Sequence, residues 1–301
     1  MEITVLGTAS IGGVPEWDCT CPNCSKARAN LNLRRTRSSI AISCGDDKYI
    51  LVDAGHDLKQ QLEAARLTPI LEKTDKTFRQ SRIDSILLTH GHADHTVGLA
   101  EFCTGRSFEI PVYAPPDLLD FLFGSETRPA YFSELGRLAK NYVVPYPLSA
   151  DDEITLLGEI RVRGFEVPHT KVLDNGRRYP SSTYAYEFEH KGSRFVYAPD
   201  LGAFTEELLS RIDGVELFIT DACFWWNDEL LRVSGIPVTS YDLGHVPMEE
   251  SVKALSKVGA RRVVYTHFNH TNPVIDASER YMGRVLDAGQ ELAYDGLKIR
   301  I

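Results

Sequence analysis

The chain has 301 residues, of which 43% are hydrophobic and 25% are charged, and these are the fractions of a globular rather than a disordered protein. The formal net charge of −9 provides no overall basic surface for nucleic acid or an anionic membrane. No apolar run reaches the roughly 18 residues of a membrane span, and the first ten residues lack the basic region of a signal peptide. We therefore expect a cytoplasmic protein with a small-molecule substrate and with neither nucleic acid nor a membrane as a partner.

Short apolar or alternating runs predict strands along the whole chain. The predicted strands are residues 3–6, 39–43, 49–53, 85–89, 112–114, 160–167, 183–188, 194–197, 216–220 and 262–266, with a final pair at 291–294 and 298–301. Helical spacing predicts helices at 57–67, after Pro116, and at 203–212, 248–258 and 277–288. Interleaved strands and helices indicate an α/β protein. Strand groups before about residue 115 and after about residue 150 fit two packed sheets with helices outside.

The domain organisation follows from the even distribution of these elements. The length allows one or two domains, but the sequence contains no internal repeat and no linker rich in Gly or Ser. We expect one domain over residues 1–301. The segment 115–148 is less periodic and could be an insertion over one face.

The strongest functional signal is a cluster of four potential metal ligands directly after a predicted strand: His90, His92, Asp94 and His95. In extended backbone His90 and His92 point to one face, whereas Asp94 and His95 lie where the chain turns into the next helix. This arrangement can begin two adjacent metal sites. Imidazole with a carboxylate suits zinc, iron or manganese better than calcium or magnesium.

Three further potential ligands each follow a predicted strand: His169, Asp200 and His267. Residues that follow strands can gather at one edge of a sheet, where functional sites usually lie. A dinuclear site that begins at residues 90–95 could therefore be completed by these three residues.

This pattern, His-X-His-X-Asp-His followed by a His, an Asp and a His after later strands, resembles the metallo-β-lactamase superfamily. The resemblance covers essentially the whole chain and implies an αββα sandwich with a dinuclear site between its two sheets. It implies one metal on His90, His92 and His169, the other on Asp94, His95 and His267, and Asp200 as the bridge. Asp53, which ends an early strand, is expected to hydrogen-bond a metal-bound histidine and fix its tautomer.

Three cysteines, Cys19, Cys21 and Cys24, fall within six positions, which favours a metal site over a disulfide framework. The surrounding residues are similar to two families, the pyrroloquinoline quinone biosynthesis protein B family and the cyclic-phosphate phosphodiesterase of the carbon–phosphorus lyase pathway. Both carry a structural zinc on Cys-X-Cys-X-X-Cys, which implies a zinc-binding loop at 12–26. A structural zinc has four ligands, and His270 is the candidate for the fourth. The alternative is a loop of free thiols.

The two resemblances imply different functions. The complete ligand set looks like that of a hydrolase that uses a dinuclear-metal hydroxide, and a phosphodiester or cyclic phosphate is the expected substrate. Asp94 would orient the nucleophile, and His245 would assist the leaving group, because the phosphodiesterase has a phosphate-contacting His at the matching place. Overall, however, the chain resembles the quinone-biosynthesis family, which implies an iron-dependent oxygenase or oxidoreductase acting on a peptide-derived amino acid. A non-catalytic binding protein is a third hypothesis.

The expected cofactors are two divalent ions of zinc, manganese or iron at the active site and one structural zinc. A homodimer is left open. Cys44, Cys103 and Cys223 are isolated among apolar residues and are expected to be core residues.

The remaining signals are weaker. Arg34, Arg35 and Arg37 could hold a substrate anion or lie in a solvated loop, and Asp221 could belong to the site or be structural. His190 lies in a predicted turn and is expected to be solvated.

Overall fold

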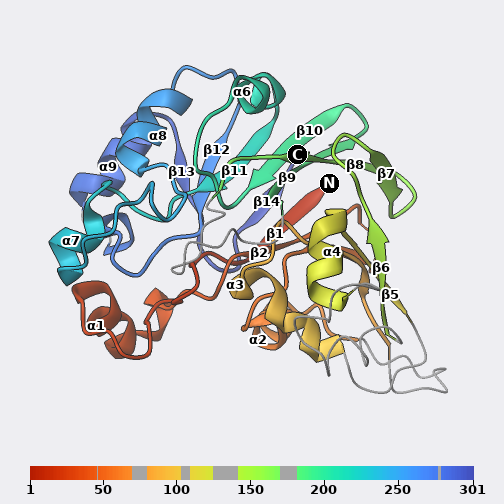
Figure 1. Ribbon diagram of the computed structural model, residues 1–301, viewed down its shortest axis with the longest axis horizontal. Helices are drawn as coiled ribbons and strands as arrows, with labels where there is room; N and C mark the ends of the chain where they lie inside the picture. The colour runs from red at the N-terminus through yellow and green to blue at the C-terminus, as the bar shows by residue number, and fades with distance from the viewer. Residues whose placement is uncertain (46, 70–79, 103–108, 125–141, 170–181, 277–278) are drawn as a thin grey trace.

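Two β-sheets pack face to face in the computed structural model, and helices cover their outer faces (Figure 1). The structure describes residues 1–301 except 46, 70–79, 103–108, 125–141, 170–181 and 277–278. The layered arrangement confirms the predicted αββα sandwich. The termini lie together, since the Met1 amine donates a hydrogen bond of 2.8 Å to the Ile301 carbonyl.

Each sheet has seven strands among the described residues. The first sheet consists, in spatial order, of β14 (Lys298–Arg300), β1 (Glu2–Gly7), β2 (Ser39–Ser43), β3 (Tyr49–Val52), β4 (Ile83–Leu87), β5 (Ile110–Ala114) and β6 (Val143–Pro147). The second sheet consists of β13 (Glu291–Leu292), β12 (Val263–Thr266), β11 (Leu217–Asp221), β10 (Ser193–Ala198), β9 (Tyr184–His190), β8 (Ile160–Glu166) and β7 (Glu153–Leu156). The two predicted strand groups are thus the two sheets, except that β14 returns to the first.

The helices divide between the two outer faces (Figure 1). The helices beside the first sheet are α2 (Leu58–Ala64), α3 (Ala93–Thr96) and α4 (Pro116–Phe123). The helices beside the second sheet are α6 (Glu206–Ile212), α8 (Met248–Leu255) and α9 (Glu279–Asp287), while α1 (Pro22–Ala29) and α7 (Glu229–Ser234) lie at the lower left of the view. Within the described ranges, no helix is both long and apolar enough to cross a membrane.

Three apolar clusters hold these layers together. One lies between the sheets and contains Ile42, Tyr186 and Val264; the other two lie under the outer helices, around Leu118 and around Met248. Because both faces of the central strands are covered, their residues are buried in succession rather than alternately, as in β2, where all five residues are buried.

Among the described residues, the strands β6 and β7 and the α-helices α1 and α7 were not predicted by the sequence pattern. β6 contains Pro145 and Pro147, and proline is tolerated at the edge of a sheet, where its missing N–H costs no ladder hydrogen bond. Both β6, which pairs with β5, and α4 lie within residues 115–148. Part of that segment lies outside the described residues, so the insertion stays a prediction, as does the single domain.

A close backbone crossing fixes the start of α3 against the loop that follows β3. The Ala54 N–H donates to the His95 carbonyl, and the Gly98 N–H donates to the Ala54 carbonyl, both at 2.8 Å. A Cβ atom on Gly98 would lie 2.2 Å from the Gly55 carbonyl oxygen. Only glycine permits this approach, which places the segment 93–98 directly on the end of the first sheet.

We expect Gly98→Ala to lower the free energy of unfolding by about 1–3 kcal/mol, because the added methyl group overpacks a backbone contact. Gly283→Ala is the control, since Gly283 lies in α9 and a Cβ there meets nothing within 4 Å. That change should stabilise the protein by up to about 1 kcal/mol through helix propensity. Denaturant unfolding measures both values, and an unaltered Gly98→Ala stability would contradict the argument.

Candidate metal centre

The candidate site lies where several strands end at one edge of the sandwich. In the first sheet β3 leads to Asp53 and β4 leads to residues 90–95; in the second, β8, β10 and β12 lead to His169, Asp200 and His267. β3 is parallel to β4, and β10, β11 and β12 are parallel to one another. Since the carboxyl ends of parallel strands meet at one edge, this is the usual place for a site in such folds.

The first group of donors contains three imidazole rings. His90 Nε2 lies 2.8 Å from His92 Nδ1, and His169 Nε2 lies 3.3 Å from the same atom. Asp200 Oδ1 is 3.9 Å from His90 Nε2 and 3.6 Å from His169 Nε2. One atom from each of the four residues therefore lies within 4.8 Å of the others, a spacing that a single cation can span.

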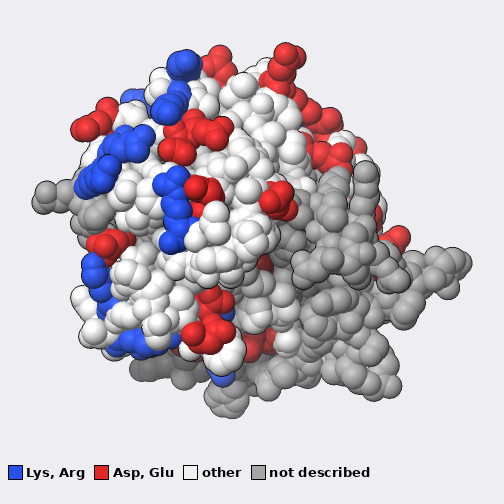
Figure 2. Space-filling model, turned by 60° about the vertical axis from the view of Figure 1, so that its left-hand side comes forward, with Lys and Arg blue, Asp and Glu red and all other residues white. Residues whose placement is uncertain are grey.

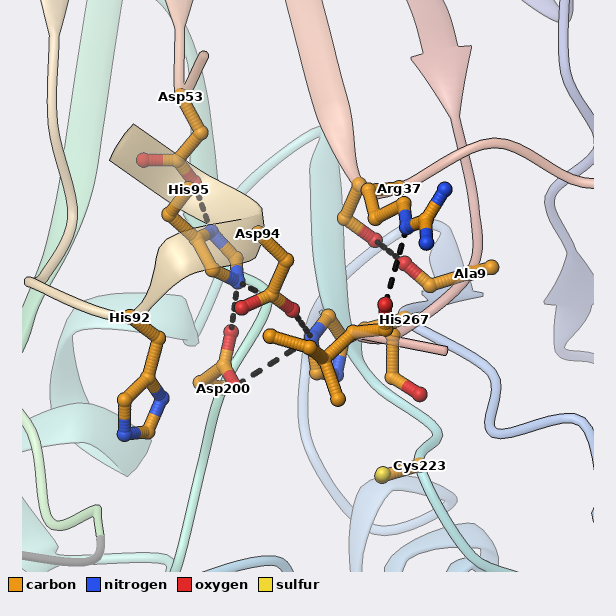
Figure 3. Close-up of polar contacts among 12 residues, drawn as sticks. Ala9, Arg37, Asp53, His92, Asp94, His95, Asp200, Cys223 and His267 are labelled. Atoms are coloured by element: carbon orange, nitrogen blue, oxygen red, sulfur yellow. Dashed lines mark hydrogen bonds and ion pairs between the residues drawn. The ribbon is translucent and has the colours of Figure 1, made fainter. Parts of the chain in front are cut away.

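The second group contains Asp94, His95 and His267, again with donor atoms within 4.8 Å of one another. Asp94 Oδ2 is 3.4 Å from His95 Nε2 and 3.3 Å from His267 Nε2. Asp200 faces this group as well, 3.2 Å from His95 Nε2 and 3.5 Å from His267 Nε2 (Figure 3). Asp200 thus lies between the two groups, where the predicted bridging ligand has to be.

Hydrogen bonds on the outer side fix which nitrogen of the rings faces the centre. His95 Nδ1 lies 2.8 Å from Asp53 Oδ2, and Figure 3 shows Asp53 beyond His95, away from Asp94. His169 Nδ1 lies 2.8 Å from the Gly244 carbonyl. Both outer nitrogens donate to these acceptors, which turns each Nε2 toward the centre, as in metal-bound histidines. Burial holds the pKa of His169 well below its ordinary value, so its Nε2 carries a lone pair. Burial alone would lower the pKa of His95, but Asp94 and Asp53 hold it well above its ordinary value, so this ring gives up a proton when a cation binds.

The protonation states of His90 and Asp94 also fit metal ligands. Burial, followed by the neighbouring histidines, holds the pKa of His90 well below its ordinary value. Burial alone would raise the pKa of Asp94, but His95 and His267 hold it well below its ordinary value, so it is a carboxylate. Neutral imidazole and carboxylate are the ligands of zinc, manganese and iron.

Two buried atoms at the centre, His95 Nε2 and Asp200 Oδ2, have no hydrogen-bond partner among the described residues. Buried polar atoms are normally satisfied, and a cation between the groups would satisfy both. The donor set therefore fits two divalent cations, and the role of each residue stays a prediction.

His245 lies beside this centre and is held by Asp221, whose Oδ2 is 2.6 Å from His245 Nδ1. Its ring centroid is 4.9 Å from that of His169. Burial alone would lower the pKa of His245, but Asp221 and then Cys223 hold it well above its ordinary value. Asp221 also accepts hydrogen bonds from the backbone N–H groups of Leu201 and Cys223, so it has structural contacts as well as a contact with His245, and its role in the site stays a prediction.

Cys223 is a residue that sequence reasoning did not assign to the site. It is buried, as expected of a core residue, but its sulfur belongs to a group with His245 and His267 whose donor atoms lie within 4.8 Å. Figure 3 shows the sulfur beside His267. The residues around Cys223 in the sequence are apolar and do not predict this contact. The contact forms because β11 and β12 are neighbouring strands, so the residues that follow them lie close together.

A cavity of about 690 Å³ opens onto the metal centre. Its polar side includes His92, Asp94 and His245, and its other side includes the apolar Phe224 and Ile236. Among the described residues that line it, none is Lys or Arg. The cavity therefore offers a substrate an apolar wall, and among the described lining residues positive charge can come from histidine.

The arginine cluster does not reach this cavity. Arg35 donates to Thr8 and to the Ala293 carbonyl, and Arg37 forms an ion pair of 3.2 Å with Asp57. These contacts hold the segment 35–37 in place, whereas Arg34 is exposed, as the interpretation of a solvated loop predicted.

The face that includes α7 and α9 carries Lys and Arg interspersed with Asp and Glu (Figure 2). No continuous basic area is visible on this face. That the protein has no nucleic-acid partner stays a prediction.

The cysteine loop and His270 also come together. Atoms from Cys19, Cys21, Cys24 and His270 lie within 4.8 Å of one another, and His270 Nδ1 is 3.5 Å from Cys21 Sγ. On the far side of the ring, His270 Nε2 lies 2.5 Å from Glu16 Oε2. This is the four-ligand arrangement expected of a structural zinc, with a carboxylate that orients the histidine.

Comparison with known proteins gives relatives of the same length. Residues 48–268 match the family described as beta-lactamase superfamily domain. Coenzyme PQQ synthesis protein B from Methylobacterium sp. (strain 4-46) is 30% identical over 313 residues, with 100% of both chains covered. The protein of that name from Xanthomonas campestris pv. campestris (strain B100) is 31% identical, also with 100% of both chains covered.

Two solved structures are also similar to this chain over 99% or more of its length. Zn²⁺-bound PqqB from Methylobacterium extorquens superposes with a TM-score of 0.89 at 28% identity, with 100% of both chains covered. A diphosphatase from the PhnP family superposes with a TM-score of 0.67 at 24% identity over 99% of this chain and 97% of that one. The second likeness shows the shared fold alone.

Asp53→Asn should weaken metal binding at the centre by about 10–100-fold, because an amide is a poorer acceptor for the N–H of His95. Competition with a chromophoric chelator measures the affinity. Asp287→Asn is the matched control, since it makes the same change at an exposed position of α9. Equal affinities in the two variants would show that Asp53 does not support the metal ligands.

Proposed function

Since this chain belongs to the beta-lactamase superfamily and, within it, to the family of coenzyme PQQ synthesis protein B, we propose that it is a metal-dependent hydrolase of a small molecule, with a phosphodiester or cyclic phosphate as the expected substrate. The observation that supports this most directly is the convergence of seven buried or half-buried donor residues, four of which (His92, Asp94, Asp200 and His267) line one cavity. A complete set of ligands for two metal ions is explained better by metal-dependent catalysis than by packing of the core.

His90, His92 and His169 would hold one divalent cation, and Asp94, His95 and His267 the other, with Asp200 shared. Such a pair lowers the pKa of a bound water toward neutrality and polarises the scissile ester. The Methylobacterium extorquens protein is Zn²⁺-bound, which favours zinc as a metal of this chain. Asp94 faces His95 and His267 and reaches the cavity, so its carboxylate can orient the attacking water.

His245 is the proposed general acid. Asp221 engages Nδ1, which leaves Nε2 as the nitrogen that can give a proton to the leaving oxygen. The ring lines the cavity, and a protonated ring also supplies positive charge opposite a phosphate. Its role does not require it to bind a metal.

The loop 12–26 would hold a separate structural zinc through Cys19, Cys21 and Cys24, with His270 as the fourth ligand. Burial raises the pKa of Cys24 to about 12, so a cation is needed to keep adjacent sulfurs as thiolates. Because Glu16 contacts His270 and also lines the cavity, this zinc would stabilise one wall of the substrate site.

A second candidate function has its own support. The full-length relatives are named for PQQ synthesis, and the described cavity wall is apolar and without Lys or Arg. These features favour an iron-dependent oxygenase or oxidoreductase that acts on a peptide-derived amino acid. The two candidates use the same ligands and differ in the metal and in the need for oxygen.

Full-length protein loaded with zinc, manganese or iron should hydrolyse bis(p-nitrophenyl) phosphate or a ribose cyclic phosphate. His92→Ala should reduce the rate by about 100-fold or more, because one metal loses a ligand, while Asp287→Asn should leave it unchanged. Absence of hydrolysis in every fully metallated form would overturn the proposal. Oxygen uptake by the iron form alone would favour the second candidate.

The proposed general acid predicts a specific pH dependence. Asp221 raises the pKa of His245, so the ring keeps its proton to higher pH and the rate falls only as the pH rises through that pKa. Asp221→Asn should lower the pKa and move the alkaline limb of kcat to lower pH. The profile is measured with the metal content matched, and His245→Gln should remove the limb. An alkaline limb that stays in place in Asp221→Asn would exclude His245 as the group responsible.

A further inference from the structure

A separate group of metal-type donors lies at the opposite end of the sandwich. Cys44 directly follows β2, Glu159 lies in the turn between β7 and β8, and His190 ends β9. β2 is antiparallel to β3, and β9 is antiparallel to β10. The ends of β2 and β9 therefore point away from the edge where β3 and β10 deliver the candidate metal centre.

The three donor atoms are close together although the residues are far apart in sequence. One atom from each of Cys44, Glu159 and His190 lies within 4.8 Å of the others. His190 Nε2 is 3.0 Å from Glu159 Oε2. Cys44 packs against the apolar cluster between the sheets, so its thiol is held in position rather than exposed on a mobile side chain.

The sequence predicted that His190 lies in a turn and is solvated. The structure shows instead that its ring is largely buried. Its side chain is only 10% exposed, and its buried Nε2 atom faces Glu159 Oε2 at 3.0 Å but forms no aligned hydrogen bond with any described residue. A buried ring nitrogen normally has a partner. This one is aimed at the carboxylate and the thiol, at a distance from which all three can face one ion.

The donor types select the class of ion. Thiolate, imidazole and carboxylate together suit zinc, whereas calcium and magnesium take oxygen ligands. Zn–S and Zn–N distances place tetrahedral donors about 3.5 Å apart, so the three residues need to close only slightly. A water can supply the fourth ligand, and the Cys44 thiol gives its proton to solvent when the metal binds.

Two positive groups face this cluster. Lys191 Nζ lies 3.3 Å from Glu159 Oε2, but its side chain is 75% exposed and can turn into solvent. The amino terminus acts on Cys44 and is already held by the Ile301 carbonyl. A divalent ion would replace Lys191 as the partner of Glu159.

We propose that Cys44, Glu159 and His190 form a further zinc site, distinct from the candidate metal centre and from the cysteine loop. Because Cys44 follows a strand of the first sheet, while Glu159 and His190 belong to the second, the bound ion would join the two sheets near the chain termini. Its role would be to stabilise the sandwich rather than to take part in the reaction.

Alkylation of Cys44 tests this site without interference from the other zinc ligands. Metal-stripped full-length protein is treated with iodoacetamide with and without added zinc, and the modification of Cys44 is followed by peptide mass spectrometry. Zinc should slow the modification of Cys44 by about tenfold or more, because a metal-bound thiolate is not available as a nucleophile. Zinc content should also be one equivalent lower in Cys44→Ser than in the unchanged protein.

Two variants separate coordination from general stabilisation. His190→Gln should abolish the zinc protection of Cys44, because it removes a ligand. Lys191→Ala should keep or strengthen that protection, because it removes only a competing charge from the same turn. The proposal is overturned if zinc does not protect Cys44, or if His190→Gln retains the full protection, since zinc would then act through the fold as a whole.

Discussion

Buried negative charge is the constraint on which the candidate site depends. Asp53, Asp94 and Asp200 are each no more than 3% exposed and converge on His95, at 2.8, 3.4 and 3.2 Å. A buried carboxylate without a compensating charge costs several kcal/mol. His267 also faces Asp94 and Asp200, but two imidazoles do not fully neutralise three carboxylates. The folded state itself therefore favours bound cations, and metal binding and folding are coupled.

The backbone is shaped to meet this constraint. Asp53 and His267 both have a φ of 63°, in the left-handed region that non-glycine residues rarely adopt. Each directly follows a buried strand, and the turn directs its side chain into the centre. The crossing of Gly98 over Gly55 brings the ligand segment onto the same strand end. Two of the described non-glycine residues with positive φ thus lie where strands deliver residues of the centre.

The sequence predicted most of the layers and most of the centre because both have local signals. His90, His92, Asp94 and His95 stand within six positions, and their spacing is informative without knowledge of the fold. Cys223 carried no such signal, because its significance comes from contacts with residues more than twenty positions away. The proline-containing β6 was missed for a different reason: a pattern of alternating apolar residues does not describe an edge strand whose partner lies on one side only.

Part of the negative net charge of the chain is buried at the candidate metal centre. Asp53, Asp94, Asp200 and Asp221 are buried around the centre and contribute to the net charge of −9 without forming an acidic surface. Ligand identity determines which cations bind, whereas the apolar wall that includes Phe224 and Ile236 determines which molecule can approach them. The two candidate functions share the ligands and the wall and differ in the metal and in the need for oxygen. Because Glu16 belongs to the cavity wall and also orients His270, the proposed structural zinc would influence the choice of substrate without touching the catalytic metals.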